Sequence, residues 1–172
     1  MKILIVDGGM EYHLMFARLG YDIVDKLDDA GVVCFTGGED VSPHLYGEEK
    51  HPKSFCNVIR DETEVAIYHA AIAKKLPMIG ICRGGQFLHV MNGGRLYQHV
   101  DGHATGKPHT LVDVHTKQVV SVTSTHHQMM RKALDGNGKV IATASESLRK
   151  EWVDGVKIKQ CLADCDIEVM WY

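Results

Sequence analysis

Apolar and polar positions alternate in blocks along the first half of the chain. Continuous apolar runs, which are typical of strands buried on both faces of a parallel sheet, lie at Lys2–Asp7, Gly31–Phe35 and Met78–Ile81, with a weaker strand at Tyr21–Val24. Helical spacing and helix-end signals between them predict helices over Tyr12–Leu19, Asp61–Lys74 and Gly84–Met91. This alternation predicts an α/β fold with a mostly parallel sheet.

The second half has shorter apolar segments separated by turns. They predict strands at Thr110–His115, Gln118–Val122, Lys139–Ala144, Ile158–Leu162 and Asp166–Trp171. We expect some of them to extend the sheet and others to form a small antiparallel extension. Glu39–Asn57 shows neither helical nor strand periodicity, which predicts an excursion loop, and residues 135–138 are predicted to form a turn. Without a repeat or linker, residues 1–172 are expected to form a single domain.

Composition narrows the function classes. The 172 residues are 45% hydrophobic and 24% charged, which are globular values, and the net charge is −3. Neither a nucleic-acid partner nor a charged tail is indicated. The N-terminal apolar run is too short for a signal peptide or a membrane span. Five scattered cysteines do not suggest a disulfide framework, so a reducing, cytoplasmic setting is expected.

The sharpest chemical signal lies at Met78–Gln86, where a strand runs through Gly80, Cys82 and Gly84 into a helix. This spacing is the nucleophile elbow with cysteine in place of serine. Small residues at the flanking positions allow the strained turn, and the helix N-terminus is expected to lower the thiol pKa. The alternative is a buried structural cysteine beside a glycine-rich helix start.

A second signal is the glycine pair that ends the strand Gly31–Phe35. Gly37 and Gly38 let the backbone approach a substrate carbonyl, and an elbow needs a second N–H donor from a neighbouring strand end. An ordinary turn is the alternative. Glu39 and Asp40, which follow, could bind a substrate amine or cap the loop through hydrogen bonds to its backbone. Both interpretations stay open.

Four segments together resemble the class I glutamine amidotransferase-like superfamily, within its gamma-glutamyl hydrolase (peptidase C26) branch. They are Phe35–Glu48, Arg60–Glu64, Leu76–Gln86 with Asn92–Tyr97, and Ser124–Gln128. The resemblance implies a three-layer, flavodoxin-like sandwich and a cysteine amidohydrolase that needs no cofactor. Its substrate would be glutamine or a gamma-glutamyl amide, and a synthetase partner is possible.

The resemblance also implies roles for individual residues. Cys82 would attack the gamma-carboxamide carbon and form a thioester, while the N–H groups of Gly38 and Arg83 would hold the oxyanion. The remaining substrate contacts would come from Gly37, Gln86, His127, Gln128 and Met129.

The family takes its catalytic base from a His-Pro-Glu segment, which is absent from these residues; the sequence stops at a strand that resembles the penultimate one of the family. Three explanations are open: a longer gene product, which we favour, a catalytically dead protein, or substitution by another histidine such as His126 or His127. The second explanation makes the chain a binding module.

The remaining polar clusters have simpler interpretations. His99, His103, His109 and His115 lack a recognised zinc spacing, so we expect solvent-facing loop histidines and no metal site. Cys161 and Cys165 are expected to be strand and turn residues. The acids of Arg60–Glu64 could be catalytic, but a helix start with acids in its first turn is favoured.

Overall fold

A computed structural model describes residues 1–131, 138–145, 151–154, 157–160 and 166–172. The chain divides into two compact units. Unit 1 comprises Met1–Val41 and Cys56–Leu88, and unit 2 comprises Ser42–Phe55 and His89–Tyr172. The expected turn at 135–138 and the cysteines at 161 and 165 lie wholly or mainly outside the described residues.

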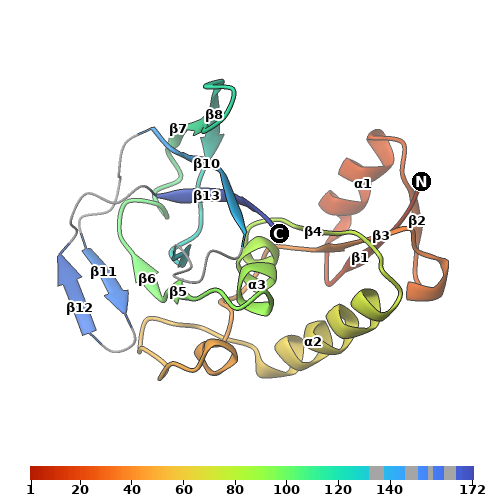
Figure 1. Ribbon diagram of the computed structural model, residues 1–172, viewed down its shortest axis with the longest axis horizontal. Coiled ribbons are helices and arrows are strands. Elements are labelled where there is room, and N and C mark those ends of the chain that lie inside the picture. The colour runs from red at the N-terminus through yellow and green to blue at the C-terminus, as the bar shows by residue number, and fades with distance from the viewer. Residues whose placement is uncertain (132–137, 146–150, 155–156, 161–165) are drawn as a thin grey trace. The chain divides into compact units, whose positions relative to one another are not determined.

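Unit 1 is built on a four-stranded parallel sheet with the order β2-β1-β3-β4 (Figure 1). The strands are β1 (Lys2–Val6), β2 (Asp22–Val24), β3 (Val32–Phe35) and β4 (Met78–Gly80). β3 is buried along its whole length, as expected for an inner strand covered on both faces. It pairs with β4 so that Phe35 lies opposite Gly80. The predicted α/β class is therefore confirmed, and the carboxyl ends of β3 and β4 lie side by side.

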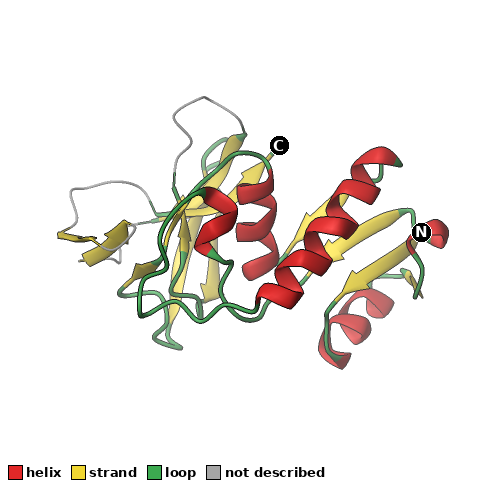
Figure 2. Cartoon of the chain, turned by 90° about the horizontal axis from the view of Figure 1, so that it is seen from below, coloured by secondary structure: helices red, strands yellow, loops and turns green. Residues whose placement is uncertain are grey.

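Two helices cover opposite faces of this sheet, α1 (Met10–Arg18) and α2 (Val58–Ala73) (Figure 2). On the α1 face, Phe16 packs with the buried strand residues Ile3, Val32 and Cys34. Helix α2 begins three residues before the predicted start because Asn57 caps it: the Asn57 side chain accepts a hydrogen bond from the Arg60 N–H at 3.2 Å. The third helix, α3 (Arg83–Met91), follows β4.

Unit 2 is mostly antiparallel. Its six-stranded sheet has the order β5-β9-β13-β10-β7-β8, and a three-stranded sheet has the order β12-β11-β6. In chain order the strands are β5 (Leu96–Tyr97), β6 (His99–Val100), β7 (Pro108–Asp113), β8 (Val119–Thr123), β9 (Met129–Met130), β10 (Lys139–Ala144), β11 (Glu151–Asp154), β12 (Lys157–Gln160) and β13 (Ile167–Trp171). The antiparallel part is thus larger than the small extension expected.

The short strands β5, β6 and β9 were not predicted, because a strand of two residues is too short to show an alternating hydrophobic pattern. Within the expected loop Glu39–Asn57 there is one 3₁₀ turn, Pro43–Tyr46; another spans Leu27–Asp29. Gln98 anchors the loop, since its Oε1 accepts hydrogen bonds from the His51 N–H (2.8 Å) and the Ser54 hydroxyl (3.1 Å). Within the described part of the chain, no helix is both long enough and apolar enough to cross a membrane.

Candidate active site

Cys82 occupies the turn between β4 and α3, and its backbone is strained. Its φ of 55° lies in the left-handed region, which non-glycine residues rarely adopt. Such strain at a strand-to-helix turn is the geometry of a nucleophile elbow. The turn leaves Cys82 exposed at the carboxyl end of the parallel strands, where ligands of open α/β sheets bind.

The two glycines that flank the nucleophile are required by space. A Cβ on Gly80 would collide with the Gly84 carbonyl and lie 2.5 Å from the Gly85 nitrogen. A Cβ on Gly84 would collide with the Phe35 carbonyl at the end of β3. These are backbone atoms that cannot rotate away, so the predicted need for small residues on both sides of Cys82 is confirmed.

The expected lowering of the Cys82 pKa is wrong. Burial of the sulfur raises the pKa of Cys82 even though the residue reaches the surface, and the negative charge of Asp40 raises it further. The backbone N–H of Arg83, at the start of α3, bonds to the sulfur and lowers the pKa, but the two raising effects outweigh it. The thiol is therefore protonated at neutral pH.

The loop after β3 lies beside the nucleophile. A Cβ on Gly37 would be 3.9 Å from the Cys82 sulfur and 2.7 Å from the Tyr12 hydroxyl. The Gly37 N–H is already used, because it donates to the Tyr12 hydroxyl at 3.0 Å. The N–H of Gly38 donates to none of the described residues, and its role as an oxyanion donor stays a prediction.

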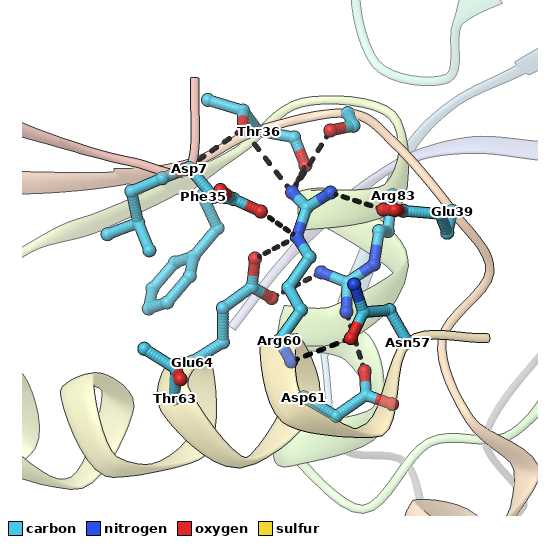
Figure 3. Close-up of polar contacts among 12 residues, drawn as sticks. Asp7, Phe35, Thr36, Glu39, Asn57, Arg60, Asp61, Thr63, Glu64 and Arg83 are labelled. Carbon is cyan, nitrogen blue, oxygen red and sulfur yellow. Dashed lines mark hydrogen bonds and ion pairs between the residues drawn. The ribbon is translucent and has the colours of Figure 1, made fainter. Parts of the chain in front are cut away.

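Arg60 of α2 holds this loop in place (Figure 3). Its guanidinium donates to the Gly37 carbonyl at 3.0 Å and to the Thr36 carbonyl at 3.3 Å. Gly38 has a φ of +148°, and a Cβ there would collide with the Arg60 guanidinium. Only glycine therefore allows Arg60 to lie this close to the loop.

Arg60 is also surrounded by acids. Its Nε lies 2.7 Å from an Asp7 oxygen and 2.9 Å from a Glu64 oxygen, and its Nη1 lies 2.9 Å from a Glu39 oxygen. A hydrogen bond from its own backbone N–H and the contact with Arg60 lower the pKa of Glu39. For Glu39 these contacts favour the loop-capping interpretation over recognition of a substrate amine.

Arg83 is the other residue expected to form the oxyanion hole, and its side chain is fixed by the same helix. Its guanidinium donates to Asp61 at 2.6 Å and makes a short bond to Glu64. Asp61 and Glu64 are fully buried. Glu64 therefore joins Arg60 and Arg83 within one network, shown in Figure 3.

The sequence interpretation of this helix start is confirmed in part. Asp61 lies in the first turn of α2, as expected, but the carboxylates of Asp61 and Glu64 are buried and pair with Arg83. The sequence alone missed this network, although the i,i+4 spacing of Arg60 and Glu64 was a signal for their ion pair.

The other predicted substrate residues lie in different places. In unit 1, Gln86 follows Cys82 by one turn of α3 and is buried. In unit 2, the Nδ1 of His127 lies 3.2 Å from the Nδ1 of His99, and Gln128 is buried. Met129 lies in β9, pairs with Tyr97 of β5 and is 1% exposed. Met129 is thus a core residue of unit 2. A shared site for these residues and Cys82 stays a prediction.

The candidate base His126 also has partners within unit 2. Its Nδ1 lies 2.9 Å from the Gln128 carbonyl and its Nε2 lies 3.6 Å from Glu168. In unit 1, His13 bonds to the Gly9 carbonyl, and His69 packs on Tyr68. Neither histidine of unit 1 forms a hydrogen bond with the Cys82 thiol.

Comparison with known proteins decides the family. The sequence model of the family described as Peptidase C26 matches residues 4–118, which is most of the chain. This chain belongs to the Peptidase C26 family. The elbow, the loop after β3 and the helix α2 all fall within the matched residues.

Named relatives agree with this assignment. A Lactococcus lactis protein named for its likeness to glutamine amidotransferases is 51% identical over 77 residues, which cover 44% of this chain and 30% of that protein. The Escherichia coli gamma-glutamyl-gamma-aminobutyrate hydrolase PuuD is 37% identical over 76 residues, covering 44% of this chain and 29% of PuuD.

A longer match comes from a Mycobacterium tuberculosis protein with a provisional glutamine amidotransferase name. It is 33% identical over 148 residues, covering 76% of this chain and 45% of that protein. The chain thus spans between about a third and a half of the length of these three relatives.

Proposed function

We propose that this C26 chain is a cysteine amidohydrolase whose nucleophile is Cys82. Its substrate would be the gamma-carboxamide of glutamine or a gamma-glutamyl amide, since relatives carry glutamine amidotransferase and gamma-glutamyl hydrolase names. The observation that supports this proposal most strongly is the strained turn at Cys82, where the Arg83 N–H donates a hydrogen bond to the sulfur and the Gly37–Gly38 loop lies beside it.

The chemistry follows from these positions. The Cys82 sulfur attacks the amide carbon, and the carbonyl oxygen becomes an oxyanion that accepts hydrogen bonds from the N–H groups of Gly38 and Arg83. The C–N bond then breaks, the leaving ammonia or amine takes the proton that the Cys82 thiol gives up on attack, and a gamma-glutamyl thioester remains. Water attacks the thioester, glutamate is released and the thiol is restored.

The network around Glu64 has a defined part in this scheme. Arg60 fixes the loop that carries Gly38, Arg83 carries the other donor, and Glu64 joins both arginines to α2. Preorganised donors need no rearrangement when charge develops, and the loss of one typically costs about 10²–10³ in kcat. Arg60 and Glu64 are therefore positioning residues.

A second function has one observation in its favour. The raised pKa leaves the thiol protonated, and no histidine of unit 1 forms a hydrogen bond with it. A protein with this arrangement that lacks a proton acceptor would bind a glutamyl group without turning it over. It would then act as a binding module, or as part of a synthetase assembly.

Glutamate release from glutamine and from a gamma-glutamyl anilide separates the two functions. The hydrolase proposal expects release by the wild-type chain, loss of it in Cys82→Ala, and no change in Cys56→Ala, which serves as the matched cysteine control. If glutamine binds in calorimetry while wild type and Cys82→Ala both release nothing, the binding module is correct. If glutamine does not bind, both functions fail.

A further inference from the structure

A second cluster of titratable side chains lies within unit 2, apart from the residues of the proposed hydrolase mechanism. His103 follows β6, His109 lies in β7, His126 precedes β9, and Glu168 lies in β13. One ligand atom each from His103, His109 and Glu168 all lie within 4.8 Å of one another. Three histidines from separate segments thus surround one carboxylate.

The burial of these groups corrects a sequence-based expectation. His103 and His109 were expected to face solvent beside an exposed loop. The structure buries His103 completely, and the side chain of His109 is only 8% exposed. His103 turns inward because its Nε2 bonds to the buried Asp166 at 2.9 Å.

The hydrogen bond to Asp166 sets the tautomer of His103. The His103 Nε2–H donates to the Asp166 carboxylate, so its Nδ1 carries a lone pair, 3.4 Å from Glu168. Histidines that bind metals almost always donate their other N–H to a carboxylate or a backbone carbonyl. His126 lies beside the cluster, with its Nδ1 2.9 Å from the Gln128 carbonyl and its Nε2 3.6 Å from the other Glu168 oxygen, Oε2, and so helps to position Glu168.

Two atoms of the cluster are buried without a hydrogen bond. The Nδ1 atoms of His103 and of His109 make no hydrogen bond to any of the described residues. Burying a polar atom without a hydrogen bond is costly, and each such atom in a native structure calls for an explanation. A cation between His103 and Glu168 would use the lone pair of the His103 Nδ1, which faces Glu168.

We propose that His103 Nδ1, His109 Nε2 and a Glu168 oxygen bind one divalent transition-metal ion, with Zn²⁺ as the best fit. Imidazole and carboxylate donors suit zinc in tetrahedral sites. Ligand bonds of about 2.0–2.2 Å in a tetrahedron place donor atoms roughly 3.3–3.6 Å apart. The His103 and His109 nitrogens lie 3.4 and 3.3 Å from the same Glu168 oxygen, Oε1.

The ion would be held by side chains alone within unit 2. Three protein ligands leave the fourth position of a tetrahedron to water. The ligand side chains are all at most 10% exposed. The ion would link β7, β13 and the segment before β7, and so stabilise the fold of unit 2 independently of Cys82.

The test uses the whole chain after chelator treatment, with Zn²⁺ and Co²⁺ as probes. Zinc affinity is measured in competition with a chromophoric chelator, and thermal unfolding is followed with and without zinc. We expect one zinc per chain and a Tm rise of about 5–10 °C when free zinc is 100 times Kd. Tetrahedral cobalt should give visible absorption without the near-ultraviolet band of a cobalt–thiolate bond.

Variants separate this site from other ligands. His109→Gln and Glu168→Gln should each weaken zinc binding about 100-fold or more, and Asp166→Asn, which changes a hydrogen bond to a ligand, about 10–100-fold. His115→Gln, on an exposed turn, is the matched histidine control and should bind zinc as wild type does. If Glu168→Gln does not fold, His109→Gln, which keeps the hydrogen bond between His103 and Asp166, carries the test.

Three results would overturn the proposal. The first is no zinc bound at micromolar concentration, which would leave the cluster as an ion-pair network. The second is a cobalt–thiolate band, which would move the metal to cysteines. The third is unchanged zinc affinity in the folded His109→Gln variant.

Discussion

Replacing Glu64 with glutamine perturbs the network that joins both proposed oxyanion donors. Glu64 is fully buried, and its two oxygens contact two buried guanidinium groups, those of Arg60 and Arg83. Glutamine keeps the volume but removes the charge, and its amide NH₂ would face one of the arginines. A donor would then oppose a donor in a site closed to water.

The size of the effect follows from the remaining partners. Breaking a buried ion pair by removing one partner costs about 3–5 kcal/mol. Arg60 keeps Asp7 and Glu39, and Arg83 keeps Asp61, so neither arginine is left without an acid. We therefore take the lower end, about 3 kcal/mol, which lowers Tm by roughly 6–12 °C for a chain of this size.

Thermal unfolding followed by circular dichroism measures this effect. Glu62→Gln is the matched control, because Glu62 lies on the same helix and is exposed, and its change should stay within about 0.5 kcal/mol. A Glu64→Gln variant whose Tm falls no more than that of Glu62→Gln would refute the reasoning, because Glu64 would then contribute nothing by joining the arginines.

Three further predictions address the elbow and its loop. Gly84→Ala, whose Cβ would collide with the Phe35 carbonyl, should lower the free energy of unfolding by more than about 3 kcal/mol, measured by denaturant unfolding. Gly31→Ala, whose Cβ would have no neighbour closer than 3.4 Å, should leave it nearly unchanged. Equal effects of the two variants would contradict the steric account. Because the pKa of Cys82 is raised, iodoacetamide should label Cys82 with a pH midpoint above the usual thiol value of about 8.5. Cys34, whose pKa burial raises to about 11, should stay unlabelled. A Cys82 midpoint below about 8 would show an activated thiol instead. Arg60→Lys loses the planar guanidinium that holds the Thr36 and Gly37 carbonyls, so it should slow labelling of Cys82 by a glutamine-analogue diazoketone about 10-fold or more. Arg18→Lys, at an exposed position, should not slow it. Equal labelling rates in both variants would show that Arg60 is not a positioning residue.

Sequence patterns predicted the parallel part of the fold well. Runs such as Gly31–Phe35 are long, apolar and flanked by glycine, and they became β3 and its neighbours. The Gly80-Cys82-Gly84 spacing predicted the elbow, because a tight turn leaves no room for a Cβ at either flank. Local sequence determines these features, so sequence reasoning could find them.

Features that depend on distant partners were missed. The fully buried state of Asp61 and Glu64 follows from Arg83, nineteen or more residues away, and nothing in the helix start alone indicates it. The histidine cluster joins residues 103, 109, 126 and 168, whose spacing matches no metal motif. The expected low thiol pKa was wrong because burial and Asp40 outweigh the N–H of Arg83, a balance that only the folded surroundings set.

Intact mass spectrometry after incubation with a glutamine-analogue diazoketone tests the central claim most directly, that Cys82 is the nucleophile of a glutamyl site. We predict a single adduct that maps to Cys82, is blocked by excess glutamine, persists in Cys56→Ala and is absent from Cys82→Ala. No adduct, or labelling spread over several cysteines and indifferent to glutamine, would contradict it.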